Sequence, residues 1–332
     1  MELNRKPSSS PINQEKEMQV VIKDFMISVV IPIMNEEENI EILSEKLKNI
    51  LCDYADYEII FVDDGSTDET LFAVKQIRKT DKKIKYLSLS RNFGHQNALK
   101  AGLDHSIGDC VVSMDGDLQH PPEIIPEMIA KWQEGYDIVY TLRQNDPKTG
   151  IFKKYTACMF YKLINSLADV DIEQGSADFR LLDRSVVEII TKFQESPLFL
   201  RGLIPWLGFK QYGVPYMPQE RYRGKTKYSI SKMLKFAIAG ITGFSIKPLY
   251  FSLQLGVIIA VLAFIFGIYA LYIRLFTDEA IQGWASILIL MSLIGGIQLI
   301  TIGVLGEYLG KMFMQQKGRP NYIVREKSDD YR

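Results

Sequence analysis

The sequence predicts an α/β domain with a mostly parallel sheet, followed by two helices that cross a membrane. Three observations predict this: apolar β-branched runs alternate with amphipathic segments, acidic motifs follow several of those runs, and two long C-terminal segments carry no charge. With 332 residues, 47% of them hydrophobic, the chain can bury a sizeable core. This composition excludes a disordered chain, a collagen-like chain and a disulfide-rich secreted scaffold.

Continuous apolar runs, typical of strands buried on both faces, recur along the first 220 residues. The expected strands are residues 26–33, 57–62, 84–89, 110–114 and 137–141. Helical spacing and polar caps predict helices over 36–51, over 67–78 with a cap at Ser66 or Thr67, over 94–105, and after Pro121-Pro122. A β-α-β-α order implies a mostly parallel sheet, whose ligands bind beyond the carboxyl ends of the strands.

The two charge-free segments, residues 248–273 and 283–306, are each long enough to span a bilayer as a helix. Buried core helices are the alternative, which uncharged runs of this length disfavour. Residues 221–247 hold seven basic and no acidic side chains, whereas the linker 274–282 is net acidic. The positive-inside rule therefore places both termini in the cytoplasm, at the inner (plasma) membrane.

These features divide the chain into five parts. We expect a polar tail over 1–25 without a signal peptide, an α/β domain over 26–220, basic interfacial helices over 221–247, two spans over 248–309 and a cytoplasmic tail over 310–332.

Several classes of protein are disfavoured. Cys52, Cys110 and Cys158 are isolated, which indicates reduced thiols rather than a disulfide or zinc framework. No GxGxxG follows the first strand and no GxxxxGK[ST] occurs, which argues against a dinucleotide fold or a P-loop NTPase. An acidic body joined to a basic strip is also not typical of a nucleic-acid binder.

Acidic motifs follow three of the expected strands: Asn35-Glu36-Glu37, Asp63-Asp64-Gly65-Ser66 and Asp115-Gly116-Asp117. Such carboxylates hold a divalent metal that bridges to a diphosphate, or accept hydrogen bonds from a base or ribose. Asp115 and Asp117 can face one hard cation, to which Gln119 can add a carbonyl oxygen. The alternatives are a solvated acidic turn and, for Asp63-Asp64, a turn with a helix cap.

The ordered motifs VIPIMNEEENI, FVDDGSTDET, LSRNFGHQNALKAGL, MDGDLQHPPE and ADFRLLDR resemble the family 2 glycosyltransferases of GT-A fold. Within them the chain is similar, over about residues 26–325, to the polyprenol-phosphate sugar transferases of the GtrB and dolichol-phosphate mannose synthase type. The resemblance implies that Pro32, Asn35 and Glu36 line a nucleotide pocket and that Asp63 and Asp64 meet the base and ribose. It further implies that Asp115, Asp117 and Gln119 hold Mg²⁺ or Mn²⁺ against the diphosphate.

The resemblance also implies catalytic roles for Asp178 and Asp117, with Asp178 at the position of the family's candidate catalytic carboxylate. A lipid monophosphate is already largely ionised near neutral pH, since its second pKa is about 6. Strong base catalysis is therefore less necessary, and we expect Asp178 to orient the acceptor or to remove a residual proton. The alternative is a structural carboxylate paired with Arg180.

Cations are needed for an acceptor phosphate, and the expected ones are Arg143, Lys154, Arg221 and Lys227. Residues 221–227 match an R-x-x-G-x-[ST]-K pattern seen in these transferases. Simple attraction of the basic strip to anionic lipid is the alternative. The histidines His95, His105 and His120 show no metal spacing, and we interpret them as structural or surface residues, although His95 lies near the expected nucleotide side.

The function implied by the resemblance is inverting transfer of a sugar, first of all glucose from UDP-glucose, to a polyprenyl (undecaprenyl) phosphate. Mannose and an aminopentose remain open as the sugar. A processive polysaccharide synthase is disfavoured because the chain lacks Q-x-x-R-W and has one hairpin, and a non-catalytic sensor because the acidic motifs are intact. The expected partners are a UDP-sugar, the lipid phosphate, the membrane and further copies of the chain, without nucleic acid.

Overall fold

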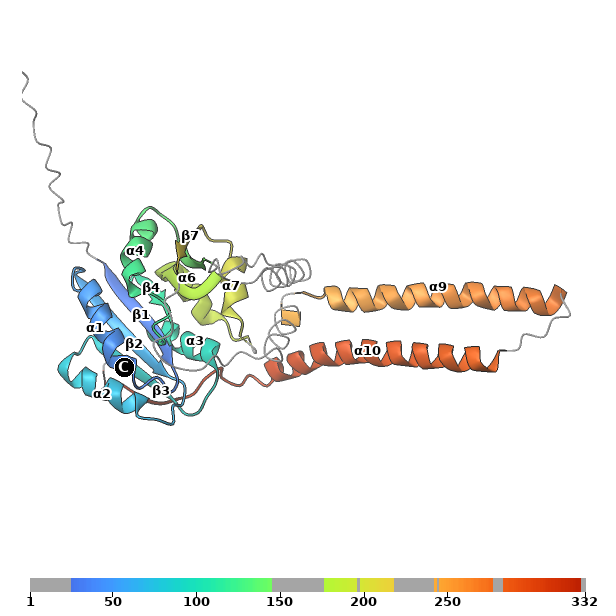
Figure 1. Ribbon diagram of the computed structural model, residues 1–332, viewed down its shortest axis with the longest axis horizontal. Helices are drawn as coiled ribbons and strands as arrows, with labels where there is room; N and C mark the ends of the chain where they lie inside the picture. The colour runs from blue at the N-terminus through green and yellow to red at the C-terminus, as the bar shows by residue number, and fades with distance from the viewer. Residues whose placement is uncertain are drawn as a thin grey trace, which may run out of the picture.

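A mixed sheet of eight strands organises the computed structural model, which describes residues 25–144, 176–195, 198–217, 242–243, 245–276 and 283–329 (Figure 1). Across the sheet the order is β7-β5-β6-β4-β1-β2-β3-β8. The strands are β1 (Met26–Ile33), β2 (Asp56–Asp63), β3 (Ile84–Leu89), β4 (Cys110–Ser113), β5 (Ile138–Arg143), β6 (Ser176–Asp183), β7 (Gln211–Tyr216) and β8 (Val324–Lys327).

The central strands run parallel, as expected. β1 pairs in parallel with β2 and β4, and β2 pairs in parallel with β3. The carboxyl ends of these strands therefore meet at one edge of the sheet. All five expected strands are present with small shifts at their ends, whereas β6, β7 and β8 were not predicted. β6 is antiparallel to both β4 and β5.

Both faces of the sheet are covered, which explains the continuous apolar runs. Val29 and Phe61 belong to one buried cluster, while Val30 and Ile60 belong to the other, as the alternation of a strand requires. The first cluster includes α1 (Ile40–Leu51), α2 (Thr70–Thr80) and α4 (Ile125–Gln133), which follows a 3₁₀ turn at Pro122–Ile124. The second includes α3 (His95–His105), α6 (Arg184–Lys192) and α7 (Leu200–Trp206).

Two helix starts differ from the expectation, and the reason lies at the edge that carries the acidic motifs. α1 begins at Ile40 rather than at residue 36, and the N-cap of α2 is Glu69, so a cap at Ser66 or Thr67 was wrong. Instead, the Asn35 backbone N–H donates to Ser66 Oγ at 3.0 Å, and the Thr67 backbone N–H donates to Asn35 Oδ1 at 2.9 Å. The loops after β1 and β2 are thus bonded to each other.

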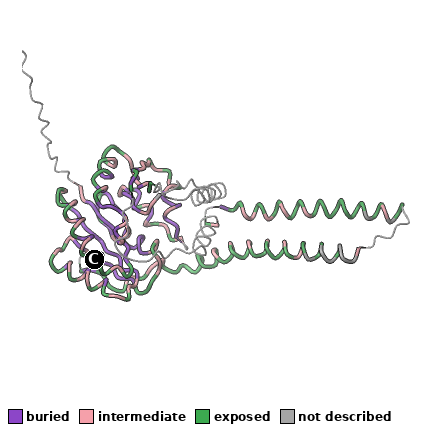
Figure 2. Tube along the Cα trace, viewed as in Figure 1, coloured by how far each residue is buried: buried purple, intermediate pink, exposed green. Residues whose placement is uncertain are grey.

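Two long helices, α9 (Lys247–Phe276) and α10 (Trp284–Gln316), extend side by side from the α/β domain (Figure 1). Each contains a stretch long and apolar enough to cross a membrane, residues Lys247–Ile273 and Leu293–Gln316. Their large apolar side chains are exposed along most of the hairpin (Figure 2). An apolar surface of this extent needs a non-aqueous surrounding.

The C-terminal segment is more than the tail expected over 310–332. α10 continues to Gln316, and the chain then returns to the domain as β8, antiparallel to β3. The Ser90 backbone N–H donates to the Ile323 carbonyl at 2.9 Å, and the Tyr322 hydroxyl donates to Asp104 Oδ2 at 2.8 Å. The physical reason is that β3 would otherwise present an open edge of unpaired backbone groups.

Candidate functional site

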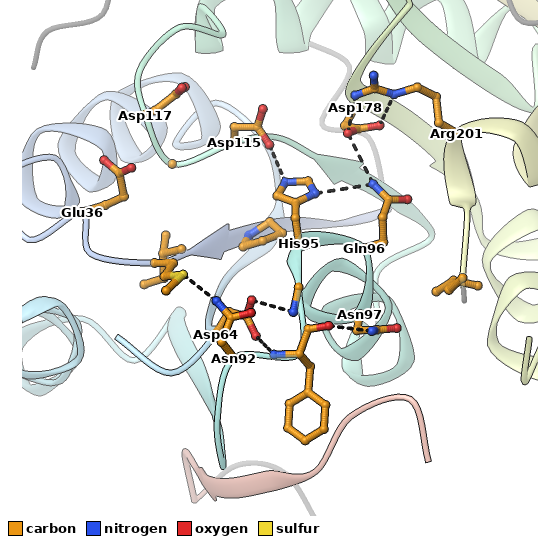
Figure 3. A pocket seen from close by; sticks show the side chains of 17 residues that line it. Glu36, Asp64, Asn92, His95, Gln96, Asn97, Asp115, Asp117, Asp178 and Arg201 are labelled. Atoms are coloured by element: carbon orange, nitrogen blue, oxygen red, sulfur yellow. Dashed lines mark hydrogen bonds and ion pairs between the residues drawn. The ribbon is translucent and has the colours of Figure 1, made fainter. Parts of the chain in front are cut away.

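An acidic cavity of about 700 Å³ opens where β1, β2 and β4 end (Figure 3). Five carboxylates line it, from Glu36, Asp64, Asp115, Asp117 and Asp178. Among the described residues that line this cavity, Arg201 is the single lysine or arginine. An anionic ligand therefore needs further positive charge to enter.

His95 binds Asp115 at the centre of the cavity, so it is more than the structural or surface residue near the nucleotide side that the sequence indicates. Nε2 of His95 lies 2.7 Å from Oδ1 of Asp115. Burial lowers the pKa of His95, but the hydrogen bond and the negative charges of Asp115 and Asp178 outweigh it and raise the pKa to about 9. For Asp115, burial raises the pKa, but His95 and the nearby His120 outweigh burial and hold the pKa of Asp115 below its ordinary value.

His120 supports the Asp115 loop through a hydrogen bond and a ring contact. Its ring is buried, stacks on Phe179 at 5.2 Å between centroids, and accepts a hydrogen bond from the Asp115 backbone N–H at 3.2 Å. The structural role expected for His120 is therefore what the structure shows, and this role fixes the position of a cavity carboxylate.

Asp178 forms an ion pair with Arg201, which the sequence analysis missed. Arg201 Nη2 donates to Asp178 Oδ2 at 2.6 Å, and Nε donates to Oδ1 at 3.1 Å. Burial raises the pKa of Asp178, but the charge and hydrogen bonds of Arg201 outweigh it and hold the pKa well below its usual range. The expected alternative partner, Arg180, donates from Nε to the Ala177 carbonyl at 3.0 Å and acts on Asp178 through its charge.

Gln96 connects the His95 and Asp178 sides of the cavity. Its amide nitrogen lies 3.5 Å from both His95 Nδ1 and Asp178 Oδ2. Its amide oxygen accepts a hydrogen bond from the Leu200 backbone N–H at 3.0 Å. The start of α3 is thereby tied to the first turn of α7, which carries Arg201.

Asp64 and Asp63 differ in their surroundings. Asp64 lines the cavity, where its carboxylate accepts from the backbone N–H groups of Phe93 at 2.7 Å and Gly94 at 3.0 Å. Asp63 is buried behind it and accepts from the Ser88 hydroxyl at 3.0 Å and from the Ser66 backbone N–H at 2.9 Å. The two carboxylates expected to meet a base and ribose are thus not equivalent: Asp64 lines the cavity, whereas Asp63 bonds to β3 and to the loop after β2.

The other residues expected to bind the nucleotide or the metal fall into two groups, those that line the cavity and those that do not. Pro32, Glu36 and Asp117 line the cavity. Asn35 is not among the lining residues, since its side chain bonds to the loop after β2. Gln119 is not among them either, and its backbone N–H donates to Asp117 Oδ1 at 3.1 Å.

Of the four expected acceptor-phosphate cations, the structure describes one. Arg143 is exposed at the end of β5, where it pairs in register with Tyr216 of β7. Burial raises the pKa of Tyr216, and the charges of Arg143, Asp115, Asp117 and Arg201 all act on this one side chain. Arg143 is not among the residues that line the acidic cavity, and Lys154, Arg221 and Lys227 lie outside the described residues.

The Asp115 and Asp117 side chains fit a hard divalent cation by their chemistry. Within the described ranges, no group of three His, Cys, Asp or Glu side chains forms a protein-only metal cage. Mg²⁺ usually takes one or two protein carboxylates and completes its shell with water and substrate phosphate oxygens. Two aspartates in a cavity with an excess of negative charge therefore suit a metal that binds together with a diphosphate.

The sequence carried only weak signals for the roles of His95 and Arg201. His95 opens the helix after the third parallel strand, so its position at the carboxyl edge was available in principle. Arg201 comes from α7, a short helix with an internal proline that no periodicity indicated. A buried carboxylate such as Asp178 needs a cation, but spacing alone does not say which one.

The comparisons with known proteins agree with this architecture. The sequence model of "Glycosyl transferase family 2" matches residues 28–190. The uncharacterized glycosyltransferase YkcC of Bacillus subtilis (strain 168) is 43% identical over 92% of this chain and 94% of its own. The chain belongs to glycosyl transferase family 2.

Further relatives in this family carry more specific names. The prophage bactoprenol glucosyl transferase homolog of Escherichia coli (strain K12) is 41% identical, over 90% of this chain and 98% of its own length. The bactoprenol glucosyl transferase of Shigella phage SfII is 39% identical, over 90% and 97%. Among solved structures, glucosyl-3-phosphoglycerate synthase from Mycobacterium tuberculosis, with Mn²⁺, UDP-glucose and phosphoglyceric acid, has a TM-score of 0.45 at 19% identity, over 66% of this chain and 78% of that one.

Family membership confirms the GT-A glycosyltransferase fold that the motifs implied. The family match runs from β1 into α6, which includes the loops with Asp64, Asp115 and Asp117 and the strand β6 with Asp178. The curated relatives extend over most of the rest of the chain, including the region of α9 and α10.

Proposed function

We propose that this family 2 glycosyltransferase transfers glucose from UDP-glucose to a polyprenyl phosphate, with inversion at C1 of the sugar. The observation that carries the proposal is the identity of about 40% with bactoprenol glucosyl transferases over nine-tenths of the chain. The presence of an acidic cavity and an apolar helical hairpin in one chain supports it, because the reaction joins a soluble nucleotide sugar to a lipid.

The donor side of the cavity is the region around Asp64 and the loops after β1 and β4. We assign nucleotide binding to Pro32, Glu36, Asp64 and Asp115, which line the cavity, and an indirect part in it to Asn35 and Asp63. Asn35 acts by bonding the loop after β1 to the loop after β2. Asp64 acts by holding the Phe93 and Gly94 backbone at the cavity wall. Asp63 acts indirectly, by fixing the ends of β2 and β3.

Asp115 and Asp117, with Gln119, are the residues we assign to Mg²⁺ or Mn²⁺. A bound divalent cation offsets the negative charge that develops on a departing diphosphate. The protein's own contribution is to hold Asp115 in place through His95 and His120. The excess of carboxylates in the cavity is the structural support for this assignment.

The transfer itself is a direct displacement. An oxygen of the acceptor phosphate bonds to C1 of glucose, the bond between C1 and the diphosphate oxygen breaks, and its electron pair leaves with UDP. The acceptor is already an anion, so no strong base is required. Arg143, Lys154, Arg221 and Lys227 are assigned to the acceptor phosphate.

The site is proposed to work at the cytoplasmic face of the cell's inner (plasma) membrane, crossed by α9 and α10. Both helices are long and apolar enough for this, and the basic residues precede the first of them. Both termini then lie in the cytoplasm with the catalytic domain. Association of copies through the apolar hairpin is part of the proposal.

The test is to incubate purified protein with labelled UDP-glucose, undecaprenyl phosphate and Mg²⁺ or Mn²⁺. Label that extracts into organic solvent and is released by mild acid is the expected result. GDP-mannose and a UDP-aminopentose in parallel reactions identify the sugar. Polymeric label would instead indicate a polysaccharide synthase, and the absence of any transfer with all donors would contradict an active enzyme.

A further inference from the structure

We propose that Arg201 binds the phosphate of the lipid acceptor and that Asp178 is a positioning residue that orients Arg201. This inference rests on the proposed function, since it assumes a phosphorylated lipid as acceptor. It adds to the expected acceptor cations a residue from α7, on the opposite side of the cavity from Asp64 (Figure 3).

The charge of the cavity favours Arg201 as the group that binds the phosphate. A lipid monophosphate carries about −1.5 to −2 near neutral pH. It must come close to a sugar diphosphate in a cavity lined by five carboxylates, where like charges repel. In the described part of the cavity wall Arg201 is the single lysine or arginine, and the other cation, the protonated His95, is bound to Asp115 on the metal side. Arg201 can therefore attract an incoming phosphate on the Asp178 side.

The geometry of the Arg201–Asp178 contact favours the same role. Arg201 contacts Asp178 through Nε and Nη2, in the two-point arrangement that fixes the plane of a guanidinium. A guanidinium whose plane is fixed in this way, on a side chain that lines the cavity, is already oriented toward a phosphate that enters the cavity. The Arg201 side chain is 26% exposed, whereas Asp178 is 11% exposed, so the arginine is the more accessible member of the pair.

The surroundings of Asp178 suit a positioning role better than that of a general base. A general base is most effective when its pKa lies near the working pH. Arg201 holds the pKa of Asp178 well below its usual range, which makes this carboxylate a weak base. Its buried two-point contact suits it instead to holding the guanidinium, with support from Gln96, which bonds to both Asp178 and the Leu200 backbone.

The experiment measures ligand binding without turnover, on the full chain in detergent. The probe is farnesyl phosphate, a short polyprenyl phosphate, titrated in the presence of UDP and Mg²⁺, with farnesol as the phosphate-free comparison. UDP binding is titrated separately. The variants are Arg201→Ala and Arg201→Lys, and the control is Lys131→Ala, which removes an exposed cation of α4 that pairs with Glu134.

The expected result is a rise of about tenfold or more in the Kd of farnesyl phosphate for Arg201→Ala, and a smaller rise for Arg201→Lys, which keeps the charge but not the fork. The Kd of UDP should stay within about threefold of the wild-type value. Lys131→Ala should leave both unchanged. An unchanged Kd for farnesyl phosphate, or a rise confined to UDP, would overturn the proposal.

Asp178→Asn separates positioning from base catalysis. A positioning role predicts a raised KM for polyprenyl phosphate, a kcat reduced by less than about tenfold, and an unchanged acid limb of the pH profile. A loss of about a hundredfold or more in kcat with unchanged KM would identify Asp178 as the base and overturn the proposal. If wild-type protein binds farnesyl phosphate through Arg201 but transfers no sugar, the proposed function fails and the inference about Arg201 stands.

Discussion

Nε2 of His95 lies 2.7 Å from Oδ1 of Asp115, so an imidazole binds the very carboxylate that the sequence motif assigns to a metal. His95 is the first residue of α3, and Asp115 follows β4. The contact therefore joins two strand-end loops across the cavity. It places a titratable cation beside a cluster of carboxylates, and its strength should depend on pH.

The His95–Asp115 contact predicts a pH-dependent stability. The pKa of His95 is about 9 in the folded protein and about 6.5 in an unfolded chain. Because the folded pKa is raised, the stabilisation is complete below about pH 6.5 and disappears as the pH rises through about 9. Thermal unfolding of wild type and His95→Gln in EDTA should therefore differ most at about pH 6 and little at about pH 10. An equal difference at both pH values would contradict this.

The contrast between Asp64 and Asp63 predicts different defects. Asp64→Asn alters a carboxylate that lines the cavity and holds the Phe93 and Gly94 backbone, so we expect the Kd of UDP to rise about tenfold. Asp63→Asn is the matched control, with the same chemical change one residue away at a buried site. It should lower the free energy of unfolding by about 1–3 kcal/mol. Calorimetric titration and chemical unfolding of both variants would contradict the assignment if the two effects were exchanged.

Gly65 controls the wall of the cavity through its lack of a side chain. Its φ is +75°, and an added Cβ would lie 2.7 Å from the Arg91 carbonyl carbon and 2.8 Å from the Asn92 nitrogen. Gly65→Ala should therefore displace the backbone next to Asn92 and Phe93 and raise the Kd of UDP. Gly135→Ala is the control, because Gly135 has φ +90° but nothing within 4 Å of an added Cβ. It should cost about 1–2 kcal/mol of stability without changing UDP binding.

Asp117 should have opposite effects with and without a divalent cation. In EDTA its carboxylate repels the diphosphate of UDP, so Asp117→Asn should bind UDP more tightly than wild type does. With Mg²⁺ or Mn²⁺ present the same change removes an expected metal ligand, so the variant should bind UDP more weakly. Titration of UDP under both conditions checks this. A change of the same sign in both would show that Asp117 does not act through a metal.

Features set by residues close together in the sequence could be predicted, whereas those set by contacts between distant parts of the chain could not. β1, β2 and the ends that carry Asp64 and Asp115 follow from local runs and from the meeting of parallel strands at one edge. Arg201 could not be assigned to Asp178, because the contact joins β6 to a short helix across 23 positions of chain. β8 was missed for a similar reason, since four mostly polar residues become a strand only beside the open edge of β3.

The C-terminal segment returns to the domain, so removing a contact that holds it there should lower the stability of the protein. The hydroxyl of Tyr322 donates to Asp104, which also accepts from Lys100 at 2.6 Å, and both burial and Asp104 raise the pKa of Tyr322. Tyr322→Phe removes a hydrogen bond to a charged group and should lower the free energy of unfolding by about 1–2 kcal/mol. Tyr212→Phe, which keeps its ring contacts with Tyr136 and Lys131, should change it little. Chemical unfolding measures both, and an equal effect of the two substitutions would show that the Tyr322 hydroxyl does not hold the segment to α3.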